Sequence, residues 1–232
     1  MPPAASPPGP HFTPALFAFL QELRENNDRA WFEANRDRFE DDVREPLIRF
    51  VIDFAPRLQK ISPHFVADPR PNGGSIFRIY RDTRFSKDKT PYKTNAGIHF
   101  RHAAGKDAHA PGFYLNLAPG QVFMACGLWR PDAPALALVR AAIVDQPGRW
   151  QKLKSSLAPR FALEGEQLAR PPRGFDADHP HVEDLRRKDF VVSTSFTDAE
   201  ACAPDFIKRY ADACRAAASL VKFLTEALGQ PF

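Results

Sequence analysis

The residues best suited to chemistry lie between Arg70 and Lys93, where basic and aromatic side chains are interleaved. Seven basic residues stand there against two acidic ones, Asp82 and Asp88, so the stretch has a charge of +5 while the whole chain has +4. The basic residues are Arg70, Arg78, Arg81, Arg84, Lys87, Lys89 and Lys93. The aromatic residues among them are Phe77, Tyr80, Phe85 and Tyr92. Such a mixture forms either a buried ionic scaffold or a binding site for an anion.

The spacing of the arginines is compatible with an anion site. Arg78, Arg81 and Arg84 recur every three residues, so they would lie on both sides of a strand but can converge in a tight loop. Guanidinium groups bind carboxylate or phosphate with paired hydrogen bonds, and a cluster of them needs anions. The expected ligand-binding residues are Arg78, Arg81, Arg84, Lys89, Tyr92 and Lys93. An anionic small molecule suits this set, and a phosphate-bearing one suits it best.

The same stretch contains residue types that are used in acid–base catalysis. Asp82 is the candidate general base and Lys89 or Tyr92 the candidate acid, with the arginines stabilising negative charge. These residue types do not specify a reaction. No phosphate-binding Gly-rich loop and no serine in a nucleophile elbow accompanies them.

Two other roles fit the same residues. The segment from Glu22 to Glu45 holds nine acidic residues and five arginines, a net charge of −4. It is either a solvated surface or an internal partner that neutralises the basic stretch in a purely structural or interaction domain. Alternatively, arginines interleaved with aromatic rings can hold the phosphates of a nucleic acid and stack on its bases. An open basic groove would favour nucleic acid, whereas a concave pocket would favour a small molecule.

The order Arg-x-x-Arg-Asp-x-Arg-Phe-x-x-Asp-Lys-x-x-Tyr, from Arg78 to Tyr92, resembles the signature of domain-of-unknown-function family 2461. Shorter segments in keeping with this family run along nearly the whole chain. They are Phe-Leu-x-x-Leu at 19–23, Trp-Phe-x-x-Asn at 31–35, Gly-Phe-Tyr at 112–114, Gly-Leu-Trp-x-Pro at 127–131, Pro-Arg-Gly-Phe at 172–175 and Leu-Arg-x-Lys-Asp-Phe at 185–190. The resemblance implies one domain over most of the chain, but it implies no reaction, cofactor or catalytic residue.

The elements that must position this motif are predicted from hydrophobic periodicity and turn signals. Helices are expected over 14–25, 29–45, 46–60, 133–145, 149–157 and 204–228. Strands are expected over 65–67, 75–80, 95–102, 112–117, 121–129 and 190–196, with a hairpin turn at 118–120. Pro56 suggests a kink or an early end of the third helix. Residues 161–168 suggest a small hairpin before a polar loop over 170–188.

This order of helices, strands joined by hairpins, and further helices is typical of α+β proteins. We therefore predict a mostly antiparallel sheet covered by N-terminal and C-terminal helices. Strand 121–129 is apolar on both faces, which predicts a central strand covered by helices. Residues 1–10 are rich in proline and are predicted to be a disordered tail, followed by a single domain over 11–232.

Composition argues against several other classes of protein. The chain is 44% hydrophobic and 26% charged, as in ordinary globular proteins. It has no apolar run of the ~20 residues that a membrane helix needs and no secretory signal, so we expect a cytoplasmic protein without a membrane partner. The three cysteines are far apart, which favours reduced thiols over a zinc site. His99 and His102 would lie on opposite faces of a strand, so we predict no metal site, and no cofactor is implied.

Overall fold

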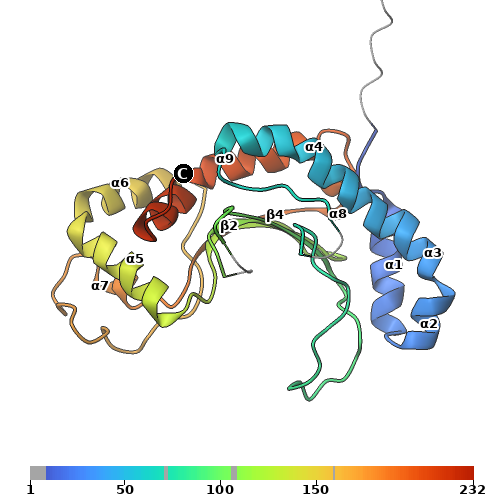
Figure 1. The fold of residues 1–232 in the computed structure, drawn as a ribbon, viewed down its shortest axis with the longest axis horizontal. Coiled ribbons are helices and arrows are strands. Elements are labelled where there is room, and N and C mark those ends of the chain that lie inside the picture. Colours follow the sequence, from blue (N-terminus) through green and yellow to red (C-terminus); the bar gives the residue numbers. More distant parts are fainter. Residues whose placement is uncertain (1–8, 71–72, 106–108, 159) are drawn as a thin grey trace, which may run out of the picture.

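A four-stranded antiparallel sheet forms the centre of the computed structural model (Figure 1). The strands lie side by side in chain order: β1 (Ala96–Arg101), β2 (Gly112–Leu117), β3 (Val122–Leu128) and β4 (Phe190–Phe196). All neighbouring strands pair antiparallel, and the bounds of the four strands were predicted to within one residue at each end. The structure describes residues 9–70, 73–105, 109–158 and 160–232, so most of the predicted tail over 1–10 lies outside the described residues.

Two long helices, α4 (Glu45–Ile61) and α9 (Phe206–Ala227), lie across one face of the sheet (Figure 1). Alternate strand residues point their apolar side chains towards these helices and are fully buried. The ring of Phe54 on α4 lies 4.7 Å from the ring of Phe100 on β1. The prediction of an antiparallel sheet covered by N-terminal and C-terminal helices is therefore confirmed, and the fold is α+β.

The N-terminal helices are more broken than predicted. The first helix, α1 (Pro14–Glu25), has the predicted bounds, but the single helix expected over 29–45 is wrong. Asn35 interrupts it, with a ψ of 18° and a side-chain amide that donates to Trp31 O at 2.9 Å. Such local side-chain bonds compete with helical backbone bonds, which accounts for the break. The pieces are α2 (Arg29–Ala34), α3 (Arg36–Phe39) and the π-helical turn η1 (Glu40–Arg44).

The two prolines of the next helix lie in its first turn and in its interior. The helix predicted over 46–60 is confirmed to within one residue at each end, and Pro46 lies in the first turn of α4, where a missing N–H is tolerated. Pro56 lies inside α4, which continues to Ile61, so the helix does not end early. Phe54 and Leu58 are both fully buried on either side of Pro56, and this packing holds the helix together.

Three helices form a lobe beyond the ends of β3 and β4, on the left of Figure 1. We call α5 (Ala133–Asp145), α6 (Pro147–Leu157) and α7 (Val182–Leu185) the helical lobe. The hairpin predicted over 161–168 is replaced by isolated bridges to Val191 and Arg187. A last short helix, α8 (Asp198–Ala201), precedes α9.

The chain before β1 forms an irregular edge and an arm. The strands predicted over 65–67 and 75–80 are wrong as regular strands, because they pair only through isolated bridges. Phe77 N donates to Gly97 O at 2.9 Å, which places this segment along the β1 edge. A further bridge between Tyr80 and Tyr92 closes the base of a projecting loop. We call residues 80–92 the arm; it extends away from the sheet in Figure 1.

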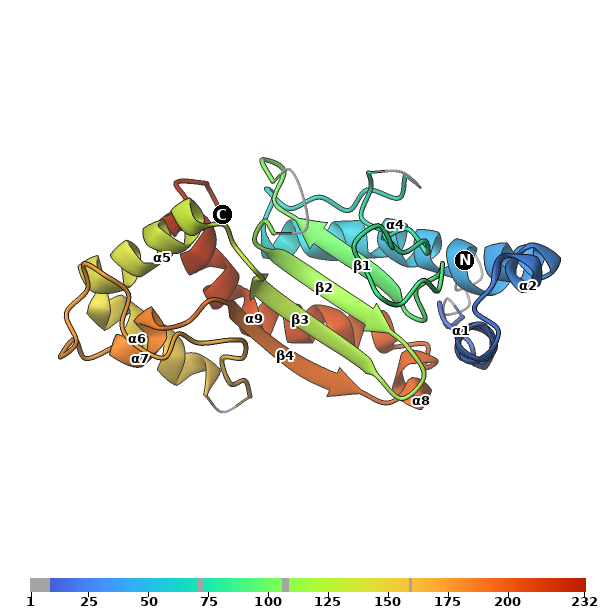
Figure 2. The same cartoon turned by 90° about the horizontal axis from the view of Figure 1, so that it is seen from below.

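The second face of the sheet has no helix across it in the described part of the chain (Figure 2). β3 is an interior strand, as predicted, but the expectation that helices cover it is wrong on this face. Phe123, Ala125 and Gly127 of β3 instead line a cleft. The apolar character that suggested burial on both sides therefore reflects a helix on one side and a cleft on the other.

Two further features concern the cysteines and the lengths of the helices. All three cysteines are free; Cys126 and Cys214 are buried and Cys202 is half-buried. Within the described ranges, no helix combines the length and the apolar character needed to cross a membrane.

Candidate functional site

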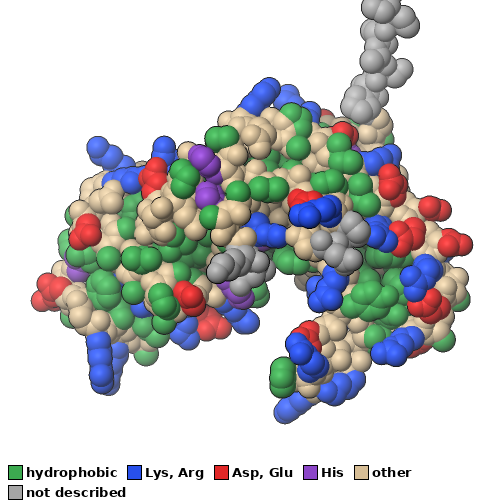
Figure 3. All heavy atoms as spheres, viewed as in Figure 1, with side chains coloured by type: hydrophobic (Ala, Val, Ile, Leu, Met, Phe, Trp, Pro, Cys, Tyr) green, Lys and Arg blue, Asp and Glu red, His purple; other side chains and the backbone are tan. Residues whose placement is uncertain are grey.

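The cleft lies over the open sheet face, between the helical lobe and the base of the arm, and has a volume of about 830 Å³. The hollow is visible in the space-filling view of Figure 3. Phe77 and Lys93 line it from the arm side, and Trp129, Arg130 and the segment around Gly165 line it from the lobe side. Its lining is predominantly apolar, as is common for small-molecule sites.

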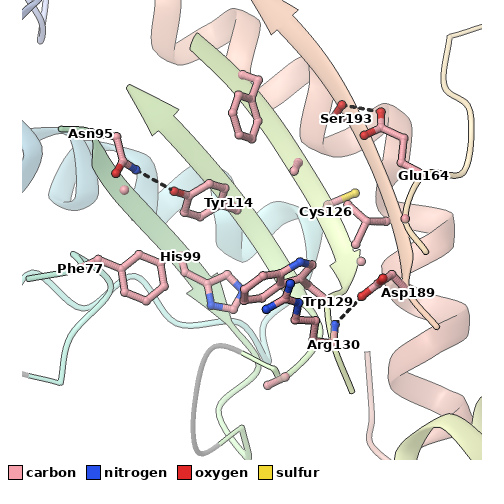
Figure 4. A pocket seen from close by; sticks show the side chains of 18 of the residues that line it. Phe77, Asn95, His99, Tyr114, Cys126, Trp129, Arg130, Glu164, Asp189 and Ser193 are labelled. Atoms are coloured by element: carbon pink, nitrogen blue, oxygen red, sulfur yellow. Dashed lines mark hydrogen bonds between the residues drawn. The ribbon is translucent and has the colours of Figure 1, made fainter. Parts of the chain in front are cut away.

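Several strand positions at the floor of the cleft are glycines, and aromatic rings of the neighbouring strand occupy the space above two of them. Gly97 on β1 and Gly112 on β2 face the cleft. A Cβ atom on Gly112 would lie 2.2 Å from His99 Nε2, and one on Gly97 would lie 2.8 Å from Tyr114 Oη. Each ring therefore lies over a glycine of the neighbouring strand. His99 and Tyr114, which are paired across β1 and β2, thus form part of the floor (Figure 4).

A hydrogen-bond network holds the β1–β2 part of this floor. The Tyr114 hydroxyl donates to Asn116 Oδ1 at 3.1 Å, and the Asn95 amide donates to the same oxygen at 2.8 Å. Asn116 Nδ2 in turn donates to Gln121 O at 2.7 Å. Burial raises the pKa of Tyr114 to about 12, so its hydroxyl is neutral at physiological pH.

Two cations lie on aromatic rings at the cleft walls. Lys93 Nζ is 5.4 Å from the centroid of the Phe77 ring and donates to Arg78 O at 2.9 Å. Burial lowers the pKa of Lys93, and the charge of nearby Arg78 lowers it further. Arg130 Cζ lies 4.9 Å from the centroid of the Trp129 ring, which is 50% exposed. Among the described residues, neither Lys93 nor Arg130 forms an ion pair with a carboxylate.

The acidic residues of the cleft already have partners (Figure 4). Asp189 accepts from the backbone N–H of Arg130 at 2.7 Å and from that of Glu166 at 3.2 Å. Glu164 accepts from the Ser193 hydroxyl at 2.6 Å, and Glu166 pairs with a lysine at 3.0 Å. Asp189 thereby holds Arg130 at a φ of 46°, a left-handed conformation that is unusual for a residue other than glycine and often marks a functional site.

The six residues predicted to bind a ligand do not share one pocket in the described part of the chain. Lys93 lines the cleft, whereas Arg81 and Tyr92 line a second, polar pocket of about 320 Å³ at the base of the arm. Arg84 and Lys89 are exposed on the arm. Arg78 is exposed near its base.

The three catalytic candidates each contact a different partner. Arg84 binds Asp82 at 2.7 Å, and hydrogen bonds from the side chain and backbone of Arg84 lower the pKa of Asp82 to about 2. Lys89 Nζ donates to Thr83 O at 2.9 Å. Tyr92 is buried with its ring 4.2 Å from that of Phe32.

The acidic segment and the basic motif pair within themselves. Arg38 binds Glu22 at 2.8 Å, and Arg44 binds Glu40 at 2.8 Å. On the arm, Arg81 binds Asp88, and hydrogen bonds from Thr90 N and then from Arg81 lower the pKa of Asp88 to about 2. Among the described residues, no ion pair joins a cation of the arm to the acidic segment over 22–45.

Most of the cleft residues were missed by sequence reasoning, which weighed His99 only as a metal ligand. Two signals pointed to them: the alternation of small and aromatic residues in β2 and β3, and the segments Gly-Phe-Tyr and Gly-Leu-Trp-x-Pro. Within the described ranges, no group of three or more potential metal ligands comes together.

The chain matches a known protein family. The family model described as a conserved hypothetical protein (DUF2461) matches residues 15–223, which include the arm and all four strands. A search of curated proteins found no match to the chain.

Proposed function

The chain belongs to the DUF2461 family of conserved hypothetical proteins, and from that premise we propose that it binds an organic anion in the cleft over its sheet. The observation that carries this proposal is the pair of cations, Lys93 and Arg130, that lie on aromatic walls without a carboxylate partner in the described part of the chain. The ligand we propose has a flat apolar body and a carboxylate or phosphate group.

The lining of the cleft supports both halves of this ligand. Phe77, Phe123 and Trp129 offer ring surfaces to an apolar body. Lys93 is partly desolvated, so an anion that binds it replaces lost hydration with a charge-assisted hydrogen bond. The acids of the opposite wall are held by backbone N–H groups, a serine hydroxyl and a lysine, which limits their repulsion of an anion.

Only part of the basic motif is placed at the ligand in this proposal. Lys93 is the residue of the predicted set that we place at the ligand, and Phe77 extends the motif into the same wall. The exposed cations Arg78 and Lys89 contribute a positive field that raises the local concentration of anions. We assign no catalytic step to Asp82.

The proposal is tested by isothermal titration of the full chain with 2-naphthoate and with 2-naphthol, its neutral counterpart. We expect naphthoate to bind and naphthol to bind at least about 10-fold more weakly, because a hydrogen bond to a charged group is worth about 1.5–3 kcal/mol. Lys93→Met and Arg130→Gln should each weaken naphthoate binding by a similar factor. Lys152→Gln, an exposed change on α6, is the control and should have no effect. Equal binding of the two probes, or unchanged affinity in both cleft variants, would contradict the proposal.

A second function is supported by one feature of the arm. Phe85 is 95% exposed, and Arg84 Cζ lies 5.8 Å from the centroid of its ring, with Lys87 and Lys89 exposed nearby. Single-stranded nucleic acid is held by this combination of stacking and charge. Fluorescence anisotropy with labelled oligothymidine should then show affinity that falls steeply with salt and is weakened by Phe85→Ser. Val66→Ser, a change at another exposed apolar residue, is the control.

A further inference from the structure

The smaller pocket, between α2 and the base of the arm, brings together two arginines and three hydroxyl groups. Arg29 comes from α2, while Tyr80, Arg81, Thr83 and Tyr92 come from the arm. We propose that this pocket is a second anion site, distinct from the cleft, and that it binds a phosphate group. The family signature then has a function that the cleft does not explain, because Arg81 and Tyr92 are fixed residues of that signature.

The charges at this pocket leave one positive group for a ligand. Glu33 also lines the pocket, but its carboxylate accepts two hydrogen bonds from Arg36, one of them at 3.0 Å, and these lower its pKa. Arg81 is paired with Asp88. Among the described residues, Arg29 has no carboxylate partner. An anion bound here would therefore neutralise Arg29.

Arg81 keeps donors available for a ligand. It uses Nη1 for both Asp88 and the Thr90 hydroxyl. In the described part of the chain its Nε and Nη2 donate to no acceptor, so this edge of the guanidinium can bind an oxyanion through two parallel bonds. Burial raises the pKa of Tyr92, which keeps its hydroxyl protonated and able to donate.

The walls of the pocket are held in place before any ligand arrives. The Asn27 side chain donates to Tyr92 O and accepts from Tyr92 N, both at 3.0 Å. The ring of Tyr92 stacks on Phe32 with an interplanar angle of 17°. Arg81 N donates to Pro91 O at 2.9 Å across the base of the arm. Such preorganisation reduces the entropy lost on binding.

The size and chemistry of the pocket indicate the class of ligand. Its volume of about 320 Å³ is at the small end for ligand sites, and its lining is largely polar. Guanidinium and hydroxyl donors around a small space suit a tetrahedral oxyanion better than an apolar molecule. The phosphate group can belong to inorganic phosphate or to a small organic monoester.

The test is isothermal titration of the full chain with inorganic phosphate and with glycerol 3-phosphate, in chloride buffer of constant ionic strength. We expect phosphate binding that Arg29→Gln weakens at least about 10-fold, because a hydrogen bond to a charged group is lost. Tyr92→Phe, which keeps the stacked ring, should weaken it by a smaller factor. Tighter binding of glycerol 3-phosphate than of inorganic phosphate would identify an organic monoester as the source, and the reverse would identify free phosphate.

Two controls separate this site from general charge effects and from the cleft. Arg24→Gln removes an exposed arginine of α1 and should leave phosphate binding unchanged. Lys93→Met should also leave it unchanged, although it weakens naphthoate binding if the cleft proposal is right. The melting temperature of Arg29→Gln without phosphate should equal that of wild type. The inference is wrong if wild type binds no phosphate at millimolar concentration, or if Arg29→Gln binds it as tightly.

Discussion

At the scale of single residues, the pairing of β3 with β4 beside the cleft depends on a position without a side chain. Gly127 on β3 has a φ of +127°, and a Cβ atom there would lie 2.0 Å from Phe190 O on β4. Because the nearest atom belongs to the backbone of a neighbouring strand, it cannot move aside without disturbing the sheet. Glycine is therefore required at position 127 for two reasons: the positive φ, and the nearby carbonyl of Phe190.

We predict that Gly127→Ala lowers the free energy of unfolding by more than about 2 kcal/mol, since a left-handed conformation and a backbone clash are both imposed on alanine. Gly148→Ala is a matched control: its Cβ would meet nothing within 4 Å and it lies in α6. That change should be neutral or stabilise by up to about 1 kcal/mol. Urea denaturation of both variants measures the difference, and equal effects would contradict the prediction.

The paired carboxylates of the arm give a prediction about pH. The pKa of Asp82 is about 2, below its usual 3.8, so the Arg84–Asp82 pair stabilises the arm above about pH 4 and is lost as the pH falls towards 2. In Arg84→Gln the pKa of Asp82 should rise towards 3.8. Asp88 should stay near 2 in the same variant, because Thr90 and Arg81 hold it. Carboxyl ¹³C shifts recorded through an acid titration measure both groups, and an unchanged Asp82 would show that Arg84 is not its main partner.

At the scale of elements, the arm is positioned by the turn between α1 and α2. Asn27 lies in that turn and makes both of its side-chain hydrogen bonds to the backbone of Tyr92. The basic residues of the arm do not anchor it to the acidic helices, since each segment forms its ion pairs internally. The neutral side chain of Asn27 therefore connects the arm to the N-terminal helices, where the charges of the sequence suggested salt bridges.

We predict that Asn27→Ala loosens the arm, because two hydrogen bonds worth about 1 kcal/mol each are lost. Trypsin should then cleave faster after the arm residues Arg84, Lys87 and Lys89, and the Tyr92 amide should exchange faster with solvent. Asn26→Ala is the control: its side-chain amide donates to Glu22 O of α1 and, among the described residues, to no residue of the arm, so cleavage in the arm should not change. Equal protection of the arm in both variants would show that other contacts position it.

At the scale of the whole molecule, buried apolar side chains from the first helices to α9 form one continuous cluster. It includes Phe12 and Leu20 near the N-terminus, Phe113 and Met124 in the sheet, and Trp150 in the helical lobe. A shared core couples the stability of the regions that contribute to it. This favours the prediction of a single domain over 11–232.

We therefore expect one cooperative unfolding transition in urea. Trp31 reports on the N-terminal helices and Trp150 on the helical lobe. In a variant that retains only one of these tryptophans, the midpoint from fluorescence should agree with the midpoint from circular dichroism. This is expected for each such variant, because regions that share a core unfold together. Two separate midpoints within one variant would show that the lobe is an independent domain.

The sequence by itself determined most of the local structure. The bounds of α1, α5, β2 and β4 agree with the predicted ranges, because hydrophobic periodicity and turn residues act over a few neighbours. It also determined the antiparallel α+β order and the family. It failed where a side chain or a distant contact outweighed periodicity, as at Asn35 and in the strand expected over 75–80.

Only the tertiary structure decided which face of the sheet stays open and which residues of the basic motif line the cleft or the smaller pocket. Alternation shows that Gly97, His99 and Arg101 share a face, but not whether a helix or a cleft lies over that face. It also cannot show that Lys93 joins Arg130 in the cleft while Arg81 joins Arg29 beside α2. These groupings depend on contacts between residues far apart in the chain, which the path of the backbone sets and local spacing does not encode.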